Sequence, residues 1–95
     1  MVMGQYDWSN AKNIELKQTR NVCFEQVVLH IGQGDLLDIL RHPNQARYPE
    51  QKILVVKMMD YVYAVPFVEE GEIRFLKTII PSRKLTRDYL EADDE

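Results

Sequence analysis

The spacing of the apolar residues changes once along this chain, and that change limits the folds open to it. In residues 24–31, "FEQVVLHI", Phe24, Val27, Val28 and Ile31 recur at the spacing of one helix face. Beyond Gly34 the runs become rich in branched and aromatic residues and are separated by turn residues, which is typical of strands. Four such runs follow: "LLDILRH", "KILVVKMM", "YVYAVPFVEE" and "EIRFLKTII".

Capping residues predict helices at both ends of the chain. Ser9 or Asp7 is suited to cap a helix over residues 10–20, with Ala11, Ile14 and Gln18 along one stripe, and Ser82 is suited to cap a last helix. Turn residues between the four runs favour antiparallel pairing, with tight reversals at Asp60 and at Gly71. We therefore expect an α+β fold with two N-terminal helices, a four-stranded mainly antiparallel sheet and a C-terminal helix.

Pro66 predicts an irregularity in the third of the four strands. Proline has no backbone N–H and cannot donate to a sheet on that side. The part of the strand that contains Pro66 is therefore expected at an edge, a bulge or a kink.

Length and composition fit one domain over residues 1–95. With 45% hydrophobic residues the chain can bury a modest core without disulfides. Cys23 is the only cysteine, and neither His30 nor His42 belongs to a ligand motif, so we expect no metal and no cofactor. No signal peptide and no run long enough to span a bilayer is found. These features predict a cytoplasmic protein with no membrane contact.

Positive charge is concentrated near the C-terminus of an acidic chain. The formal net charge is -3, yet residues 73–90 hold five of the twelve cations. These are Arg74, Lys77, Arg83, Lys84 and Arg87. Acidic residues flank them, and residues 91–95 are expected to form a frayed acidic tail. In a weakly acidic chain, such local charge indicates a small cleft or a basic partner rather than a protein that binds nucleic acid non-specifically along its length. A solvated helix in which Arg87 pairs with Asp88 or Glu91 is the alternative explanation of the same charges.

Strand alternation divides these cations. Arg74 and Lys77 are separated by an odd number of residues, so on a regular strand they point to opposite faces, with Lys77 on the face of Phe75 and Ile79. Arg83 and Arg87 lie one helical turn apart and can point the same way. The cations therefore form a corner rather than a stripe.

The connection between the first two strands supplies further groups for nucleic-acid chemistry. They are His42, Arg47, Tyr48 and Lys52, and Tyr61 and Tyr63 share one face of the third strand. Metal-free RNA cleavage needs a base for the 2′-hydroxyl, cations for the phosphate and an acid for the leaving oxygen. Aromatic rings can stack the splayed bases. The sequence has a candidate for each of these roles.

Three short motifs add a family resemblance that covers residues 6–90. Trp8 is followed by Lys12, Val22-x-Phe24-Glu25 leads into the second helix, and Ile80-x-x-Arg83-Lys84-x-Thr86 forms the corner. Together they resemble the BrnT-like ribonuclease toxins of bacterial type II toxin–antitoxin systems, which are related in fold to RelE. The chain departs from that family at Ser9, at Thr19-Arg20-Asn21 and at Pro81, the last of which touches the corner.

The resemblance implies a RelE-like fold and a metal-independent ribonuclease that inhibits translation, acting on RNA that is free or ribosome-associated. It implies as partner a cognate antitoxin with a ribbon-helix-helix part, through which the pair reaches operator DNA. The alternative is a non-catalytic protein-binding module whose cationic corner docks an acidic partner segment.

Within the ribonuclease hypothesis each candidate residue has a role. Arg83 and Lys77 clamp the phosphate, Arg47 stabilises the transition state, and His42 is the acid or base because imidazole titrates near neutral pH. The expected RNA contacts are Tyr48, Lys52, Tyr63, Lys84 and Arg87.

Overall fold

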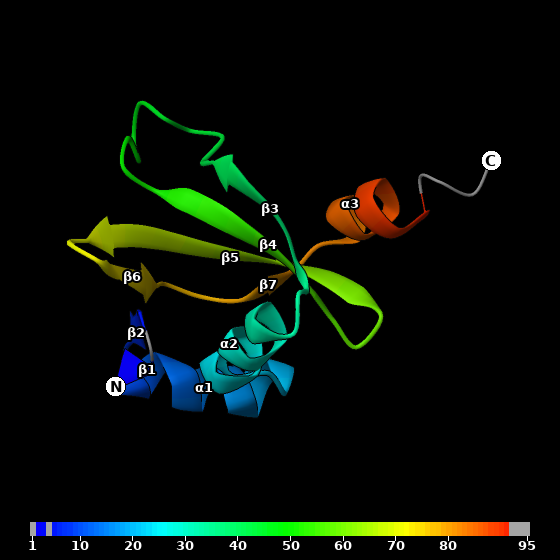
Figure 1. Ribbon diagram of the computed structural model, residues 1–95, viewed down its shortest axis with the longest axis horizontal. Coiled ribbons are helices and arrows are strands. Elements are labelled where there is room, and N and C mark those ends of the chain that lie inside the picture. Colours follow the sequence, from blue (N-terminus) through cyan, green and yellow to red (C-terminus); the bar gives the residue numbers. More distant parts are fainter. Residues whose placement is uncertain (1, 4, 92–95) are drawn as a thin grey trace.

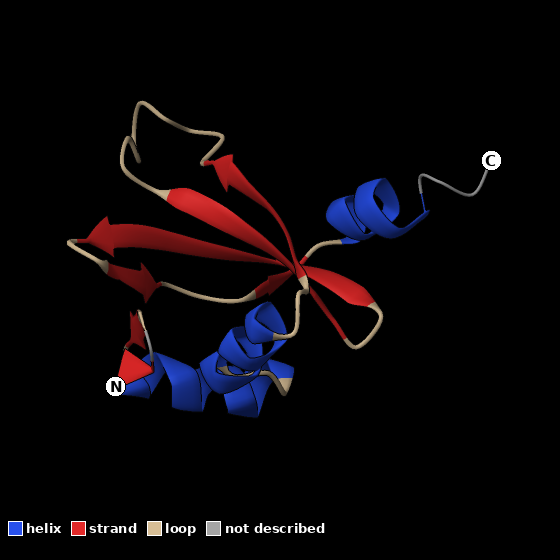
Figure 2. Ribbon diagram, viewed as in Figure 1, coloured by secondary structure: helices blue, strands red, loops and turns tan. Residues whose placement is uncertain are grey.

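Most of the chain is arranged around one seven-stranded sheet in the computed structural model, which describes residues 2, 3 and 5–91. The strands are β1 (Val2–Met3), β2 (Tyr6–Trp8), β3 (Leu36–Arg41), β4 (Lys52–Met58), β5 (Tyr61–Glu70), β6 (Ile73–Leu76) and β7 (Ile80–Pro81). They are ordered β1-β2-β6-β5-β4-β3, and β7 also pairs with β5. Helices α1 (Asn10–Arg20) and α2 (Phe24–Gly32) lie together, while α3 (Arg83–Thr86) lies apart from them (Figures 1 and 2).

The α+β class fits this structure and most strand pairings are antiparallel, but the expected four-stranded, RelE-like sheet is wrong, because the sheet has seven strands and one parallel pair. Residues ahead of the first helix form β2, which pairs in parallel with β6, so that Tyr6 lies opposite Arg74 and Trp8 opposite Leu76. This pairing joins parts of the chain that are far apart in sequence, so no turn motif between the two strands could predict it. A three-residue strand is also too short to show alternation.

The fourth predicted strand is divided into β6 and β7, and the break lies opposite Pro66 of β5. The Pro66 carbonyl accepts the Lys77 backbone N–H at 2.8 Å. In an antiparallel strand the N–H and C=O of one residue point to the same side, so the absent N–H of Pro66 would also have faced this side. There the pairing of β5 stops at the end of β6 and resumes at β7. The expected irregularity is present, but in a central strand rather than at an edge.

Helix α1 has the predicted bounds, but a different face is buried. Ser9 caps it, because its Oγ accepts the Lys12 N–H at 3.2 Å. Leu16 and Asn13 are buried, whereas Ile14, on the expected stripe, is 48% exposed. The buried face of α1 was predicted wrongly because one of its two buried residues is an asparagine, which a pattern of apolar residues does not include.

Helix α2 buries the predicted stripe against the sheet. Phe24 and Val27 are fully buried, and Val28 and Ile31 are partly buried against the same core. The Phe24 ring stacks on Trp8, with ring centroids 5.6 Å apart. The other fully buried core side chains come mainly from the sheet: Leu54, Val56, Met58, Val65, Phe67 and Ile79.

Asn13 fastens the two helices to each other. Its Oδ1 accepts the Phe24 backbone N–H at 2.8 Å, and its Nδ2 donates to Glu25 Oε1 at 2.8 Å. The bond from Asn13 holds the pKa of the Glu25 carboxyl below its ordinary value. The amide of Asn13 thus caps α2 from a neighbouring helix.

Asn13→Ala is expected to lower the free energy of unfolding by about 2 kcal/mol, because it leaves the buried Phe24 N–H without a partner. Urea unfolding followed by circular dichroism measures the change. Asn10→Ala, at an exposed asparagine of the same helix, is the control and should change stability little. Equal stability of the two variants would contradict the capping role of Asn13.

The C-terminal segment is helical as predicted and begins at the predicted cap. Ser82 Oγ accepts the Leu85 N–H at 3.1 Å, and α3 continues into a π-helical turn, η1 (Arg87–Glu91). Glu91 of the predicted frayed tail belongs to η1, and residues 92–95 lie outside the described residues. Within the described chain, none of the helices has the length and apolar character needed to cross a membrane.

Candidate functional site

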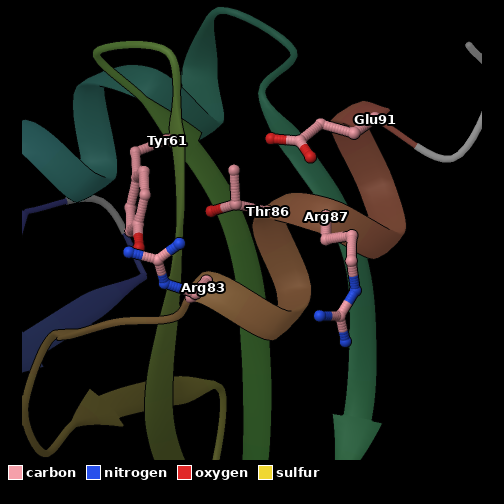
Figure 3. Close-up of a pocket in the computed structure, with 5 residues that line it drawn as sticks. All are labelled: Tyr61, Arg83, Thr86, Arg87 and Glu91. Carbon is pink, nitrogen blue, oxygen red and sulfur yellow. The ribbon is translucent and has the colours of Figure 1, made fainter.

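A cavity of about 180 Å³ lies where the C-terminal helical segment meets the start of β5 (Figure 3). It is lined by Tyr61, Arg83, Thr86, Arg87 and Glu91. Pockets that enclose a drug-sized ligand have volumes of about 300–1,000 Å³. The cavity is therefore suited to one small group, such as a phosphate, with the rest of a longer ligand outside it.

Hydrogen bonds to β5 fix the position of α3. The Ser82 N–H donates to the Val62 carbonyl at 3.0 Å, and Thr86 Oγ1 accepts the Val62 N–H at 2.9 Å. The same Thr86 hydroxyl donates to the Ser82 carbonyl at 2.8 Å. Because the hydroxyl is engaged both as donor and as acceptor, Thr86 holds the wall of the cavity and is not a free nucleophile.

Thr86→Val is expected to lower the free energy of unfolding by about 1–3 kcal/mol, because the buried Val62 N–H loses its acceptor while the side-chain shape is kept. Hydrogen exchange at Val62 should become faster. Thr86→Ser keeps the hydroxyl and serves as control. Slow exchange retained in the valine variant would show that this bond does not hold α3.

Arg83 brings to the cavity a guanidinium that is free to bind an anion. Neither a hydrogen bond nor an ion pair joins its guanidinium to any other described residue. Its guanidinium lies beside the hydroxyl end of Tyr61, whereas Arg87 extends away from Tyr61 (Figure 3). Glu91 directs its carboxylate toward the cavity from the far side of Thr86.

Asp88 forms ion pairs with the other two cations of this helical segment. Lys84 Nζ lies 2.8 Å from Asp88 Oδ2, and Arg87 Nε lies 3.8 Å from Asp88 Oδ1. The hydrogen bond from Lys84 lowers the pKa of the Asp88 carboxyl. The local pairing of Arg87 with Asp88 that the sequence suggested is confirmed, and Arg83 is left out of it.

The residues of the connection between β3 and β4 do not join this cavity. Lys52 is paired with Phe67, whereas α3 is bonded to Val62, and five residues of β5 at about 3.3 Å each span about 17 Å. His42 lies one step beyond Lys52, since its N–H donates to the Gln51 carbonyl. Figure 1 shows this connection and α3 toward different ends of the sheet. His42, Arg47, Tyr48 and Lys52 therefore form a separate group.

The side chains of that group pack on one another. The rings of His42 and Tyr48 lie 4.5 Å apart, and the Arg47 guanidinium lies 5.6 Å from the Tyr48 ring centre. His42 Nδ1 accepts the Asn44 N–H at 3.0 Å. Lys52 Nζ is 3.4 Å from Glu69 Oε1. The connection is thus partly ordered by its own aromatic and cationic residues.

The predicted separation of Arg74 from Lys77 is confirmed. Arg74 lies over the Phe67 ring at 5.4 Å, on the core side, and Lys77 lies over the Phe75 ring at 5.2 Å, on the other side. The Lys77 backbone is bonded to Pro66, four residues along β5 from Val62. The structure therefore brings Lys77 to the middle of the sheet and not to the cavity.

Sequence reasoning missed three residues of the cavity. Tyr61 lines it, while Tyr63, the expected stacking residue, packs against the core with its ring 5.8 Å from that of Tyr61. Thr86 and Glu91 were not predicted as site residues. Glu91 lies four positions beyond Arg87, as Arg87 does beyond Arg83, so the helical spacing of these three residues was a signal that was present.

Among the described residues no group of histidine, cysteine and carboxylate side chains is arranged to hold a metal ion. Comparisons with protein-family models, with curated proteins and with solved structures gave no match.

Proposed function

We propose that the protein is the toxin of a bacterial type II toxin–antitoxin pair. It is a cytoplasmic ribonuclease that cleaves RNA without a metal, inhibits translation and is neutralised by a cognate ribbon-helix-helix antitoxin. The resemblance of its three motifs to the BrnT-like toxins supports this proposal. The single observation that carries it is the unpaired Arg83 guanidinium beside a cavity of phosphate size.

The cavity residues suit an RNA phosphate and its neighbours. A guanidinium can donate two parallel hydrogen bonds to phosphate oxygens, which fits the role given to Arg83. Arg87, which extends outward, then faces the next phosphate of the strand. The half-buried ring of Tyr61 offers a surface on which a splayed base stacks. An RNA single strand would thus cross the cavity with one phosphate inside it.

Production of the protein in a bacterial host tests the proposal. Growth is expected to stop after induction, and total RNA is expected to contain new fragments that appear before growth stops. RNA gels and mapping of fragment ends provide the measurement. Normal growth of cells that hold soluble, folded protein would contradict the toxin function.

A second function is favoured by the separation of His42 from the cavity, because no histidine then stands beside the bound anion. In that case the corner is a binding surface for an acidic segment of a partner protein. A synthetic peptide of aspartate and glutamate should then bind, Arg83→Ala should abolish the binding, and RNA should stay intact.

A further inference from the structure

Glu91 is the carboxylate among the cavity-lining residues, and neither Arg83 nor Arg87 pairs with it. An arginine and a glutamate four residues apart on a helix commonly form an ion pair. Here Arg87 pairs with Asp88 instead, with its Nε 3.8 Å from Asp88 Oδ1. The Glu91 side chain is exposed and points into the space above Thr86 (Figure 3). Its carboxylate is therefore available to accept a proton from a ligand in the cavity.

We propose that Glu91, rather than His42, is the general base of RNA cleavage; this inference rests on the ribonuclease function proposed above. The Glu91 carboxylate takes the proton of the 2′-hydroxyl, and the 2′-oxygen forms a bond to phosphorus. The bond from phosphorus to the 5′-oxygen breaks, and that oxygen takes a proton from water. The products are a 2′,3′-cyclic phosphate and a 5′-hydroxyl end.

The arrangement around Thr86 places the two groups that this step needs on either side of one phosphate. Arg83 reaches the cavity from the first turn of α3, and Glu91 reaches it from the end of η1. A guanidinium can balance the charge that builds on the phosphate oxygens while the carboxylate approaches the adjoining ribose.

The other polar groups are less suited to the role of base. The Thr86 hydroxyl is bonded to both Val62 and Ser82. His42 lies beyond Lys52, which is about 17 Å along β5 from the level of Val62. Its Nδ1 is also occupied by the Asn44 N–H. Within the described residues, Glu91 is thus the base that the cavity offers.

Replacement of the carboxylate by an amide tests the inference. Cleavage of an RNA oligonucleotide by purified Glu91→Gln, measured in EDTA under single-turnover conditions, is expected to be slower by about 10²–10⁴-fold. Binding of a 2′-deoxy oligonucleotide of the same sequence should be unchanged or tighter, because a negative charge is removed. Glu72→Gln, an exposed carboxylate in the β5–β6 turn, is the control and should cleave as the unmodified protein does.

The pH profile separates a base from a residue that only shapes the cavity. The pH–rate profile of the unmodified protein should have an acid limb that is missing from the profile of the residual cleavage by Glu91→Gln. Glu91→Asp should keep part of the rate. Full cleavage by Glu91→Gln, with Arg83→Ala inactive, would overturn the role of Glu91 and leave the ribonuclease function intact. No cleavage by the unmodified protein would overturn both.

Discussion

Arg83→Ala is expected to restore growth to cells that produce the protein, and to slow RNA cleavage by about 10²–10³-fold, as does removal of one donor to a developing oxyanion. The Arg83 guanidinium has no ion pair or hydrogen bond to a described residue, so the fold does not need its charge. Growth curves and cleavage rates measure the effect, and unchanged unfolding curves establish that the variant is folded.

Two further variants define what Arg83 contributes. Arg83→Lys keeps the charge but loses the two-pronged donor, so it should recover only part of the rate. Lys17→Ala removes an exposed cation from α1 and is the matched control; it should arrest growth as the unmodified protein does. Equal toxicity of Arg83→Ala and Lys17→Ala would remove Arg83 from the mechanism.

Phe24→Ala is expected to lower the free energy of unfolding by about 3–5 kcal/mol, a large share of the stability of a domain of this size. The Phe24 side chain is 0% exposed and stacks on Trp8, which is itself buried in the core. The substitution leaves a cavity between α2 and the sheet and removes the ring contact as well. Thermal and urea unfolding measure the loss.

Leu29→Ala provides the control for that substitution. Leu29 lies on the same helix but is 57% exposed, so its truncation should cost much less than 1 kcal/mol of stability. A similar loss in the two variants would contradict the placement of α2 with Phe24 against the sheet.

Local signals predicted most of the elements of this fold. Ser9 and Ser82 mark helix starts that the structure confirms, and the apolar spacing of Phe24 and Val27 identifies the buried face of α2. The parallel pairing of β2 with β6 could not be predicted in this way, because it depends on contacts between Tyr6 and Arg74 that no local pattern encodes. Sheet size was therefore underestimated.

The candidate site was predicted in part for a similar reason. Helical spacing placed Arg83 and Arg87 on one segment, and both line the cavity. His42 and Arg47 were grouped with them only because their chemistry is suitable, since sequence gives no distance between a strand connection and a distant helix. The register of β4 against β5 provides that distance and separates the two groups.

We propose that the protein cleaves RNA at the cavity beside Arg83. Incubation of the purified protein with an RNA oligonucleotide in EDTA, in parallel with Arg83→Ala, tests it most directly. The predicted result is cleavage that leaves 5′-hydroxyl ends and that the variant slows by about 10²–10³-fold. Intact RNA with folded protein, or equal cleavage by the two proteins, would contradict it.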